Sequence, residues 1–180
     1  MAGIIKVNQY QDFNGNTLFT SDGNGNLTTQ KTNYPDFQIT LGSTQTIADA
    51  STTKVEFDTE DFDTDNAFDV SAYKFTVPTG KAGKYFLSSS GEIFDNNDLV
   101  QARLEIYKNG SAEKIGPTTN VGSAGTSEAR APIFVSSILD LAENDYIEIY
   151  CNYASDDGNG AQLIGASTKR TIFYGCRIGS

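Results

Sequence analysis

Short runs in which apolar and polar residues alternate are the feature that most constrains how this chain folds. A period of two places successive side chains on opposite faces of a strand, and no stretch shows the helical period of 3.6. Many such runs, separated by turn residues, predict an all-β antiparallel sandwich or jelly roll. The expected strands are residues 37–41, 55–57, 73–77, 84–90, 99–107, 133–141, 146–153 and 171–178. Within the run 99–107, the inward positions are Val100, Ala102, Leu104 and Ile106.

The first 33 residues differ from the rest of the chain. They contain two similar pieces, 14–18 and 24–27, and each is centred on an Asn-Gly step of the kind that closes hairpins. A β-meander of this size buries little surface alone, so it should pair with neighbouring chains or dock on another protein. A flexible tail is the alternative. We therefore expect an attachment or oligomerisation arm over residues 1–33 and a head over residues 34–180.

The composition excludes several kinds of chemistry. The chain has no histidine, which removes Ser-His-Asp and Cys-His nucleophile arrangements, and only two cysteines, which removes nitrogen- and thiolate-rich zinc sites. No phosphate-binding Gly-rich loop is present. A glycosidase needs only two carboxylates, but with 23 acids in the chain a chance pair is inevitable. We expect no enzymatic activity, no catalytic residue and no cofactor site.

The charge and hydropathy limit the partners. The net charge of −10 repels phosphate backbones, and the only close basic pair is Lys169-Arg170, so we expect no nucleic-acid binding. No stretch is long and apolar enough to insert into a membrane. The N-terminus lacks the apolar middle region of a signal peptide, which predicts that the chain folds where it is made.

Two further groups of residues leave alternatives open. The acidic run of residues 56–69 and the loop Asp156-Asp157-Gly158 are compatible with a calcium site, but they lack the EF-hand pattern, and solvated acidic loops are the simpler interpretation. Cys151 lies at an inward position of its strand. A buried free thiol is favoured there over a disulfide with Cys176.

The spacing of aromatic residues resembles that of one known family. Residues 57–85 and the closing strand around Phe173-Tyr174-Gly175 resemble the signature of the C1q globular-head family. The matching positions are Phe57, Asp63, Phe68, Phe75, Gly83, Tyr85, Phe173 and Gly175. The segments 137–141 and 143–149 look like the penultimate hairpin of that family. Two departures occur: the gap before Gly83 is longer than usual, and Leu87 stands near a usual aromatic.

This resemblance implies a C1q/tumour-necrosis-factor-like jelly-roll head that assembles as a homotrimer. Strands with large side chains on both faces fit such an assembly, because one face fills the core and the other meets a second subunit. The places where we expect this are Tyr85-Phe86-Leu87 and Tyr146 with Tyr150.

A second resemblance concerns the arm. The segments 1–7, 15–23 and 25–28 are similar to N-terminal segments of appendage proteins of tailed phages that infect cyanobacteria. This implies a structural virion protein, docked on other virion proteins through residues 1–33 as a capsid decoration, neck or tail knob. An adhesin tip of a tail fibre, which would bind a host receptor or polysaccharide through loops 116–130 and 155–160, is the alternative. A polysaccharide-cleaving enzyme is disfavoured by the missing histidine.

Overall fold

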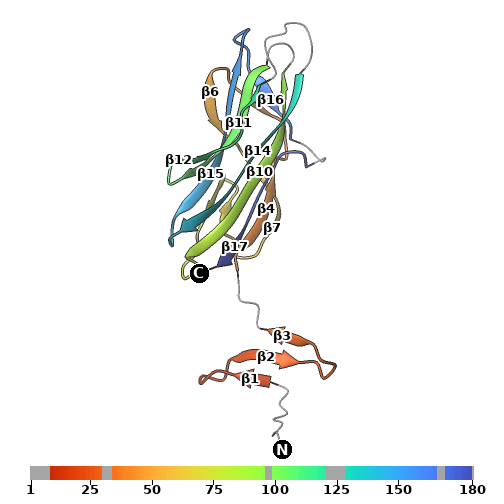
Figure 1. The fold of residues 1–180 in the computed structure, drawn as a ribbon, viewed down its shortest axis with the longest axis vertical. Helices are drawn as coiled ribbons and strands as arrows, with labels where there is room; N and C mark the ends of the chain where they lie inside the picture. The colour runs from red at the N-terminus through yellow and green to blue at the C-terminus, as the bar shows by residue number, and fades with distance from the viewer. Residues whose placement is uncertain (1–8, 30–33, 96–98, 121–128, 166–168, 180) are drawn as a thin grey trace, which may run out of the picture. The chain divides into compact units, whose positions relative to one another are not determined.

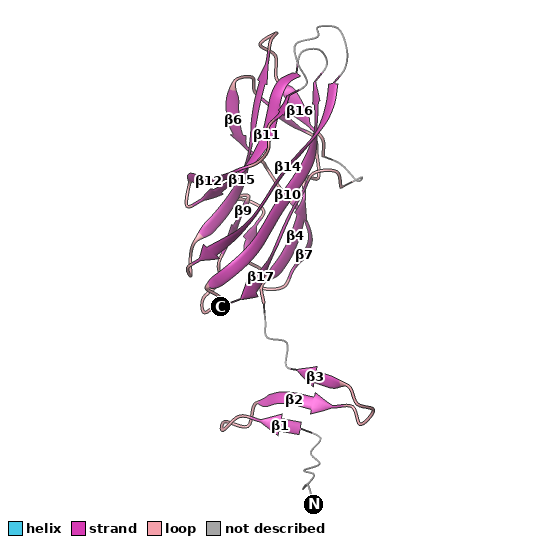
Figure 2. Cartoon of the chain, viewed as in Figure 1, coloured by secondary structure: helices cyan, strands magenta, loops and turns pink. Residues whose placement is uncertain are grey.

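The structure is a computed structural model that describes residues 9–29, 34–95, 99–120, 129–165 and 169–179. The chain divides into two compact units, Met1–Tyr34 and Pro35–Ser180. The boundary expected from the sequence lies one residue away from this division. All regular elements in the described ranges are strands (Figure 2).

The N-terminal unit contains an antiparallel meander of β1 (Gln9–Gln11), β2 (Thr17–Ser21) and β3 (Leu27–Thr29). Its two turns share one construction. In the first, Asp12 Oδ1 accepts the backbone N–H groups of Asn14 and Asn16 at 2.9 and 2.8 Å, and Asp22 does the same ten residues later. The predicted Asn-Gly hairpins are confirmed, and residues 1–8 and 30–33 of the predicted arm lie outside the described residues.

The head is an antiparallel two-sheet sandwich, as the sequence predicted (Figure 1). In the first sheet the order is β5-β16-β10-β17-β4-β7. β16 and β17 pair with successive parts of one edge of β10, and β14 pairs with the opposite edge along the whole length of β10. The strands of this sheet are β4 (Asp36–Thr40), β5 (Gln45–Ile47), β7 (Thr59–Asp63), β10 (Gly83–Asp95), β14 (Ala129–Leu141), β16 (Ala161–Leu163) and β17 (Ile172–Gly179).

The second sheet has the order β12-β11-β15-β9-β8, with β13 paired to β11 and β6 paired to β15. Its strands are β6 (Ser51–Lys54), β8 (Phe68–Asp69), β9 (Lys74–Thr76), β11 (Leu99–Lys108), β12 (Ser111–Ile115), β13 (Thr119–Asn120) and β15 (Tyr146–Ser155). The β11–β12 hairpin turns at Asn109 and Gly110, which have φ values of +53° and +79°, as an Asn-Gly turn requires.

A cluster of aromatic rings fills the space between the sheets. The ring of Phe37 lies 4.5 Å from that of Phe75 and 5.0 Å from that of Phe173. Phe57, Phe68 and Tyr85, which the sequence placed in the core, are also buried. Gly175 lies directly against Phe37, where an added Cβ would approach the ring to 2.9 Å. The aromatic signature therefore identifies core positions and, through them, the fold.

The structure corrects two local predictions. Residues 55–57 do not form a strand, because β6 ends at Lys54, although Val55 and Phe57 are buried as expected. The register of β11 against β15 shifts between Leu99 and Gln101, so Leu99 is fully buried and Val100 only half-buried. Both errors arise at strand ends, where pairing to a neighbour rather than local alternation determines the outcome.

Candidate assembly face

The strand period places two sets of side chains on opposite sides of the first sheet. Along β10 the odd-numbered residues from Gly83 to Asp95 are buried, and the even-numbered residues point away from the core. The same alternation runs through β14, where Ile133 and Val135 are buried, while Phe134 and Ile138 are exposed to 54% and 57%. This sheet therefore carries large apolar side chains on the side that faces away from the core.

The register gathers these outward side chains into rows. Phe86 of β10 lies opposite Ile138 of β14 and Cys176 of β17. Ser90 lies opposite Phe134 and Ile172 in the same way. We call the outer apolar face the set formed by Phe86, Phe134, Ile138, Ile172, Tyr174 and Cys176.

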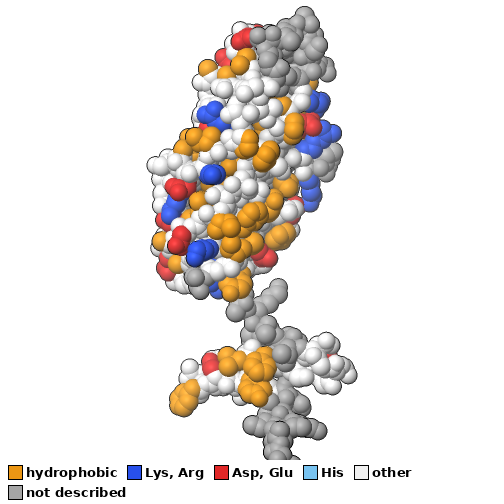
Figure 3. Space-filling model, viewed as in Figure 1, with side chains coloured by type: hydrophobic (Ala, Val, Ile, Leu, Met, Phe, Trp, Pro, Cys, Tyr) orange, Lys and Arg blue, Asp and Glu red, His pale blue; other side chains and the backbone are white. Residues whose placement is uncertain are grey.

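Side chains of this face contact one another across strands. The rings of Phe86 and Tyr174 have centroids 6.1 Å apart. Figure 3 shows hydrophobic side chains gathered in a band over β10 and β14. Phe134 and Ile138 are exposed and the other four members of the face are partly exposed, and an apolar surface of this kind marks an interaction site.

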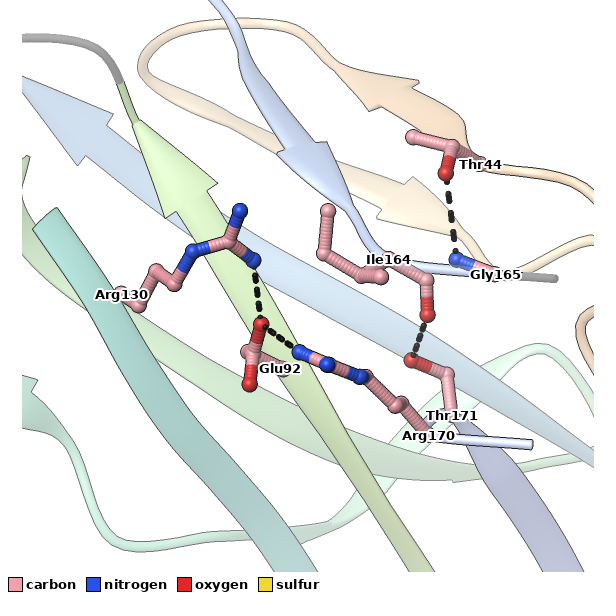
Figure 4. Close-up of polar contacts among 7 residues, drawn as sticks. All are labelled: Thr44, Glu92, Arg130, Ile164, Gly165, Arg170 and Thr171. Atoms are coloured by element: carbon pink, nitrogen blue, oxygen red, sulfur yellow. Dashed lines mark hydrogen bonds and ion pairs between the residues drawn. The ribbon is translucent and has the colours of Figure 1, made fainter. Parts of the chain in front are cut away.

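One end of the same face is charged. Glu92 and Phe94 follow along β10, and Arg130 of β14 lies opposite Phe94. Arg130 Nη1 and Arg170 Nη1 donate to the same oxygen, Glu92 Oε1, at 2.6 and 2.7 Å, and reach it from two sides (Figure 4). The hydrogen bond from Arg130 and the contact with Arg170 hold the pKa of Glu92 below its ordinary value. We call these three residues the Glu92 cluster.

Local hydrogen bonds fix the segment that carries Arg170. Thr171 Oγ1 donates to the Ile164 carbonyl at 2.7 Å, and the Gly165 N–H donates to Thr44 Oγ1 at 3.4 Å (Figure 4). The guanidinium of Arg130 lies 4.7 Å from the centre of the Phe94 ring, a cation–π contact. The Arg130 side chain therefore has two contacts, Glu92 and the Phe94 ring, whereas the Arg170 side chain contacts Glu92 and extends from a hydrogen-bonded segment.

The acidic run predicted as a solvated loop is partly a strand. Asp61 lies on β7, forms an ion pair with Lys169, and accepts a hydrogen bond from Gln38 Nε2 at 2.8 Å. The hydrogen bond from Lys169 lowers the pKa of Asp61, with a smaller contribution from Gln38. Among the described residues, no group of three or more Cys, Asp or Glu side chains is placed to hold a metal ion.

The two cysteines occupy different environments. Cys151 is a free, fully buried thiol on β15, as predicted, and burial raises its pKa to about 12. Cys176 is also free, but it is only partly buried and belongs to the outer apolar face. Burial raises the pKa of Cys176 as well.

The second pair of residues predicted for subunit contact lies elsewhere. Tyr85 and Leu87 are core residues and Phe86 points outward, as the sequence predicted. Tyr146 and Tyr150, however, belong to β15 in the other sheet, where Tyr150 stacks on Tyr107 with ring centroids 4.0 Å apart. The two predicted places therefore lie on opposite outer faces of the sandwich, and the structure does not bring them together.

The loops expected to bind a receptor are described only in part. Residues 121–128 of the loop 116–130 lie outside the described residues. In the loop 155–160, Asp157 accepts hydrogen bonds from the backbone and side chain of Asn159 at 2.9 and 2.7 Å. The described ranges contain no helix with the length and apolar character of a membrane span.

Sequence reasoning did not identify the charged end of the face. Arg130 and Arg170 are 38 and 78 residues away from Glu92, so only the sheet topology brings them together. The outward apolar side chains of Phe134 and Ile138 could have been predicted from the sequence, because apolar residues occupy both faces of the run 133–139. That pattern is typical of a strand covered on both sides.

Comparison with known proteins gives the fold but no family. No protein-family model matches the sequence, and no curated protein matches it. Among solved structures, the globular domain of the zebrafish complement 1qA protein matches with a TM-score of 0.54 and 13% identity, over 80% of this chain and 97% of that one. Murine APRIL at pH 8.5 matches with a TM-score of 0.56 and 14% identity, over 81% and 99% of the two chains. The head has the C1q/tumour-necrosis-factor fold.

Proposed function

We propose that this protein is a non-enzymatic, homotrimeric structural protein of a tailed-phage virion. In this proposal the heads associate through the outer apolar face, and residues 1–33 dock the trimer on other virion proteins. The product is a short appendage, such as a capsid decoration, a neck component or a tail knob.

The outer apolar face is the observation that carries the assembly. Phe134 and Ile138 are more than half exposed on one chain, which leaves large apolar side chains in water. Full burial of a side chain of this size contributes about 1.5–3 kcal/mol, so covering the exposed half of each contributes about half of that, and a contact that buries the whole face is favoured. The resemblance to C1q heads, which associate in threes, supports a trimer over other stoichiometries.

The virion assignment is supported by the N-terminal unit. Three short strands bury little surface, and Tyr10 and Leu18 are 44% and 50% exposed. Such a meander gains stability by docking. The similarity of segments 1–7, 15–23 and 25–28 to phage appendage proteins supports a virion as the docking surface.

A matched pair of variants tests the assembly. Ile138 on the outer apolar face and Ile115 on β12 of the other sheet are exposed to 57% and 56%. We expect sedimentation velocity to show a trimer for the wild-type chain and for Ile115→Ser, and monomers for Ile138→Ser. Equal behaviour of the two variants would contradict the proposed face.

The thiol of Cys176 reports on the same contact. In the trimer Cys176 should be covered and unreactive toward a thiol reagent under native conditions, whereas Ile138→Ser should expose it. Cys151, which is fully buried in the core, should stay unreactive in both. Fast labelling of Cys176 in the wild-type trimer would place the contact on another surface.

The placement in a virus is tested on particles. Mass spectrometry and cryo-electron microscopy of purified phage should find the protein in a copy number that is a multiple of three. A capsid decoration would repeat around the shell, whereas a neck or tail part would not. Absence of the protein from purified particles would refute the virion role but leave the trimer in place.

An adhesin role is the second candidate, and the outward-facing Tyr107–Tyr150 stack favours it. Aromatic rings on an outer surface provide a platform for sugar rings. If the head binds a host polysaccharide there, binding on a glycan array should be lost in Tyr150→Ala and kept in Phe62→Ala, because Phe62 is exposed on β7 of the other sheet. If the wild-type trimer binds neither glycans nor host cells, the adhesin role is refuted and the structural role remains.

A further inference from the structure

We propose that Arg130 and Arg170 bind one additional anionic group, a carboxylate or a phosphate, when the outer apolar face is covered. This inference rests on the proposed assembly, because it concerns what happens to the Glu92 cluster when a second copy covers it.

The Glu92 cluster has an excess of positive charge. Two guanidinium groups share a single carboxylate oxygen, so each cluster carries one positive charge in excess. The two arginine side chains are 53% and 45% exposed on a single chain, where water screens that excess. Within the described part of the chain, both arginines use only Nη1 in these contacts, so the other N–H groups of each fork remain available.

The Glu92 cluster lies next to the outer apolar face. Glu92 lies two residues from Ser90, whose neighbours across the strands are Phe134 and Ile172 of the outer apolar face. A contact that buries this face therefore removes water from the cluster or from its edge. An uncompensated charge is costly once water is excluded, and buried charges in proteins are paired for this reason.

The two guanidinium groups supply the geometry that would receive the anion. Arg130 lies over the Phe94 ring, and both guanidinium groups are oriented by their hydrogen bonds to Glu92 Oε1. They reach this oxygen from two sides (Figure 4). Planar forks that are held in place bind carboxylate or phosphate oxygens with good geometry and little loss of entropy.

Two sources can supply this chemistry. A neighbouring copy can donate a carboxylate, since the chain has 23 acidic residues against 13 basic ones. A free phosphate can enter from solution instead. A carboxylate supplies the one negative charge that balances the two arginines and Glu92, and a phosphate supplies at least that much.

The test compares trimer dissociation constants by sedimentation for the wild-type chain, Arg170→Gln, and Lys114→Gln. Lys114 lies on the exposed strand β12 of the other sheet, so its variant makes the same charge change away from the face. Arg170→Gln leaves Glu92 and Arg130 as a balanced pair. If an additional anion is bound, this variant should weaken the trimer about tenfold or more, the loss of one charge-assisted contact, while Lys114→Gln should not. A trimer that is unchanged or stronger in Arg170→Gln would overturn the inference.

Phosphate at constant ionic strength distinguishes the two sources. If phosphate strengthens the wild-type trimer but not that of Arg170→Gln, the anion comes from solution. In that case Glu92→Gln should bind phosphate more tightly than the wild-type chain, because the competing carboxylate is gone. If phosphate has no effect and Arg170→Gln still weakens the trimer, a neighbouring copy supplies the carboxylate.

Failure of the assembly and failure of the anion site give different results. A wild-type chain that sediments as a monomer refutes the proposed trimer, and the Glu92 cluster then stays in water, where its excess charge needs no further anion. A wild-type trimer that Arg170→Gln leaves unchanged or strengthens refutes the anion site and leaves the trimer in place.

Discussion

Phe173 shows how much a single ring contributes to the head. It is 1% exposed, and its ring lies 5.0 Å from that of Phe37 and 5.9 Å from that of Phe57. Phe173→Ala should lower the free energy of unfolding by about 3–5 kcal/mol, because it leaves a cavity in the core. Chemical denaturation measures this loss. Phe62→Ala is the control, since Phe62 is 46% exposed on β7, and an equal loss in both variants would contradict the described core.

Adding a side chain at Gly175 tests the same core by overfilling it, whereas Phe173→Ala leaves a cavity. A Cβ at this position would lie 2.7 Å from a methyl group of Leu87 and 2.9 Å from the ring of Phe37. Gly175→Ala should therefore destabilise the head by about 1–3 kcal/mol through overpacking. At Gly179 a Cβ would meet no atom within 4 Å, so Gly179→Ala should change the melting temperature little. If Gly179→Ala destabilised the head more than Gly175→Ala, this part of β17 would pack differently from the description.

Asp145 makes the stability of the head depend on pH. Burial raises the pKa of Asp145, but hydrogen bonds from Asn109, Lys108 and Ala142 outweigh it and hold the pKa below the ordinary value. The unfolded chain therefore binds a proton more readily than the folded one. The stabilisation is present above the ordinary pKa of an aspartate, about 4, and is lost as the pH falls through the lower folded-state pKa.

Asp145→Asn removes this titrating group. Between neutral and acidic pH, the melting temperature of the head should fall less steeply in the variant than in the wild-type chain. Asp12→Asn, which lies in the N-terminal unit, should leave the slope of the head unchanged. Parallel pH profiles for Asp145→Asn and the wild-type chain would show that other carboxylates account for the acid sensitivity.

At the scale of elements, the long strands were predictable, as were the short strands β4 and β9 (expected at 37–41 and 73–77), but the other short strands of the head were not. The expected strands 84–90, 99–107, 133–141, 146–153 and 171–178 correspond to β10, β11, β14, β15 and β17. Strands such as β6, with the sequence Ser-Thr-Thr-Lys, carry no apolar alternation. They form because a neighbouring strand offers hydrogen-bonding partners, which a local pattern does not contain.

The candidate site also contains residues that the sequence predicts and residues that it does not. Phe86 was predictable, since a ring between two core positions on one strand must point outward. The Glu92 cluster was not, because its members come from β10, β14 and the segment before β17, and only the sheet order makes them neighbours. Charged pairs of this kind depend on topology rather than on spacing along the chain.

The two units of the chain predict a simple result for truncation. All residues of the buried core lie between Phe37 and Phe173, within the unit Pro35–Ser180. A chain that lacks residues 1–33 should therefore melt at the same temperature as the head of the full chain, as measured by circular dichroism. The same truncation should abolish incorporation into virions if the arm is the docking element. A large fall in melting temperature would show that the head needs the arm for its own stability.

At the scale of the whole molecule, the net charge of −10 opposes association of identical chains. Repulsion between like charges is screened over about 8 Å at physiological salt but extends to about 30 Å at 0.01 M. The proposed trimer should therefore dissociate more readily as the ionic strength is lowered, because the apolar contact is little changed by salt while the repulsion grows. Sedimentation at two salt concentrations measures the shift. Tighter association at low salt would indicate that opposite charges, rather than apolar side chains, dominate the contact.

The place of β17 in the first sheet affects how the head is made. β17 lies between β10 and β4, yet it follows every other described strand of that sheet in the sequence. Until the ribosome has translated β17, the edges of β4 and of residues 84–90 of β10 that will pair with β17 have no partner strand. Exposed strand edges promote aggregation, so nascent heads are vulnerable until translation passes Gly179. A premature stop codon before Ile172 would leave every copy in that state, and the product would collect in inclusion bodies.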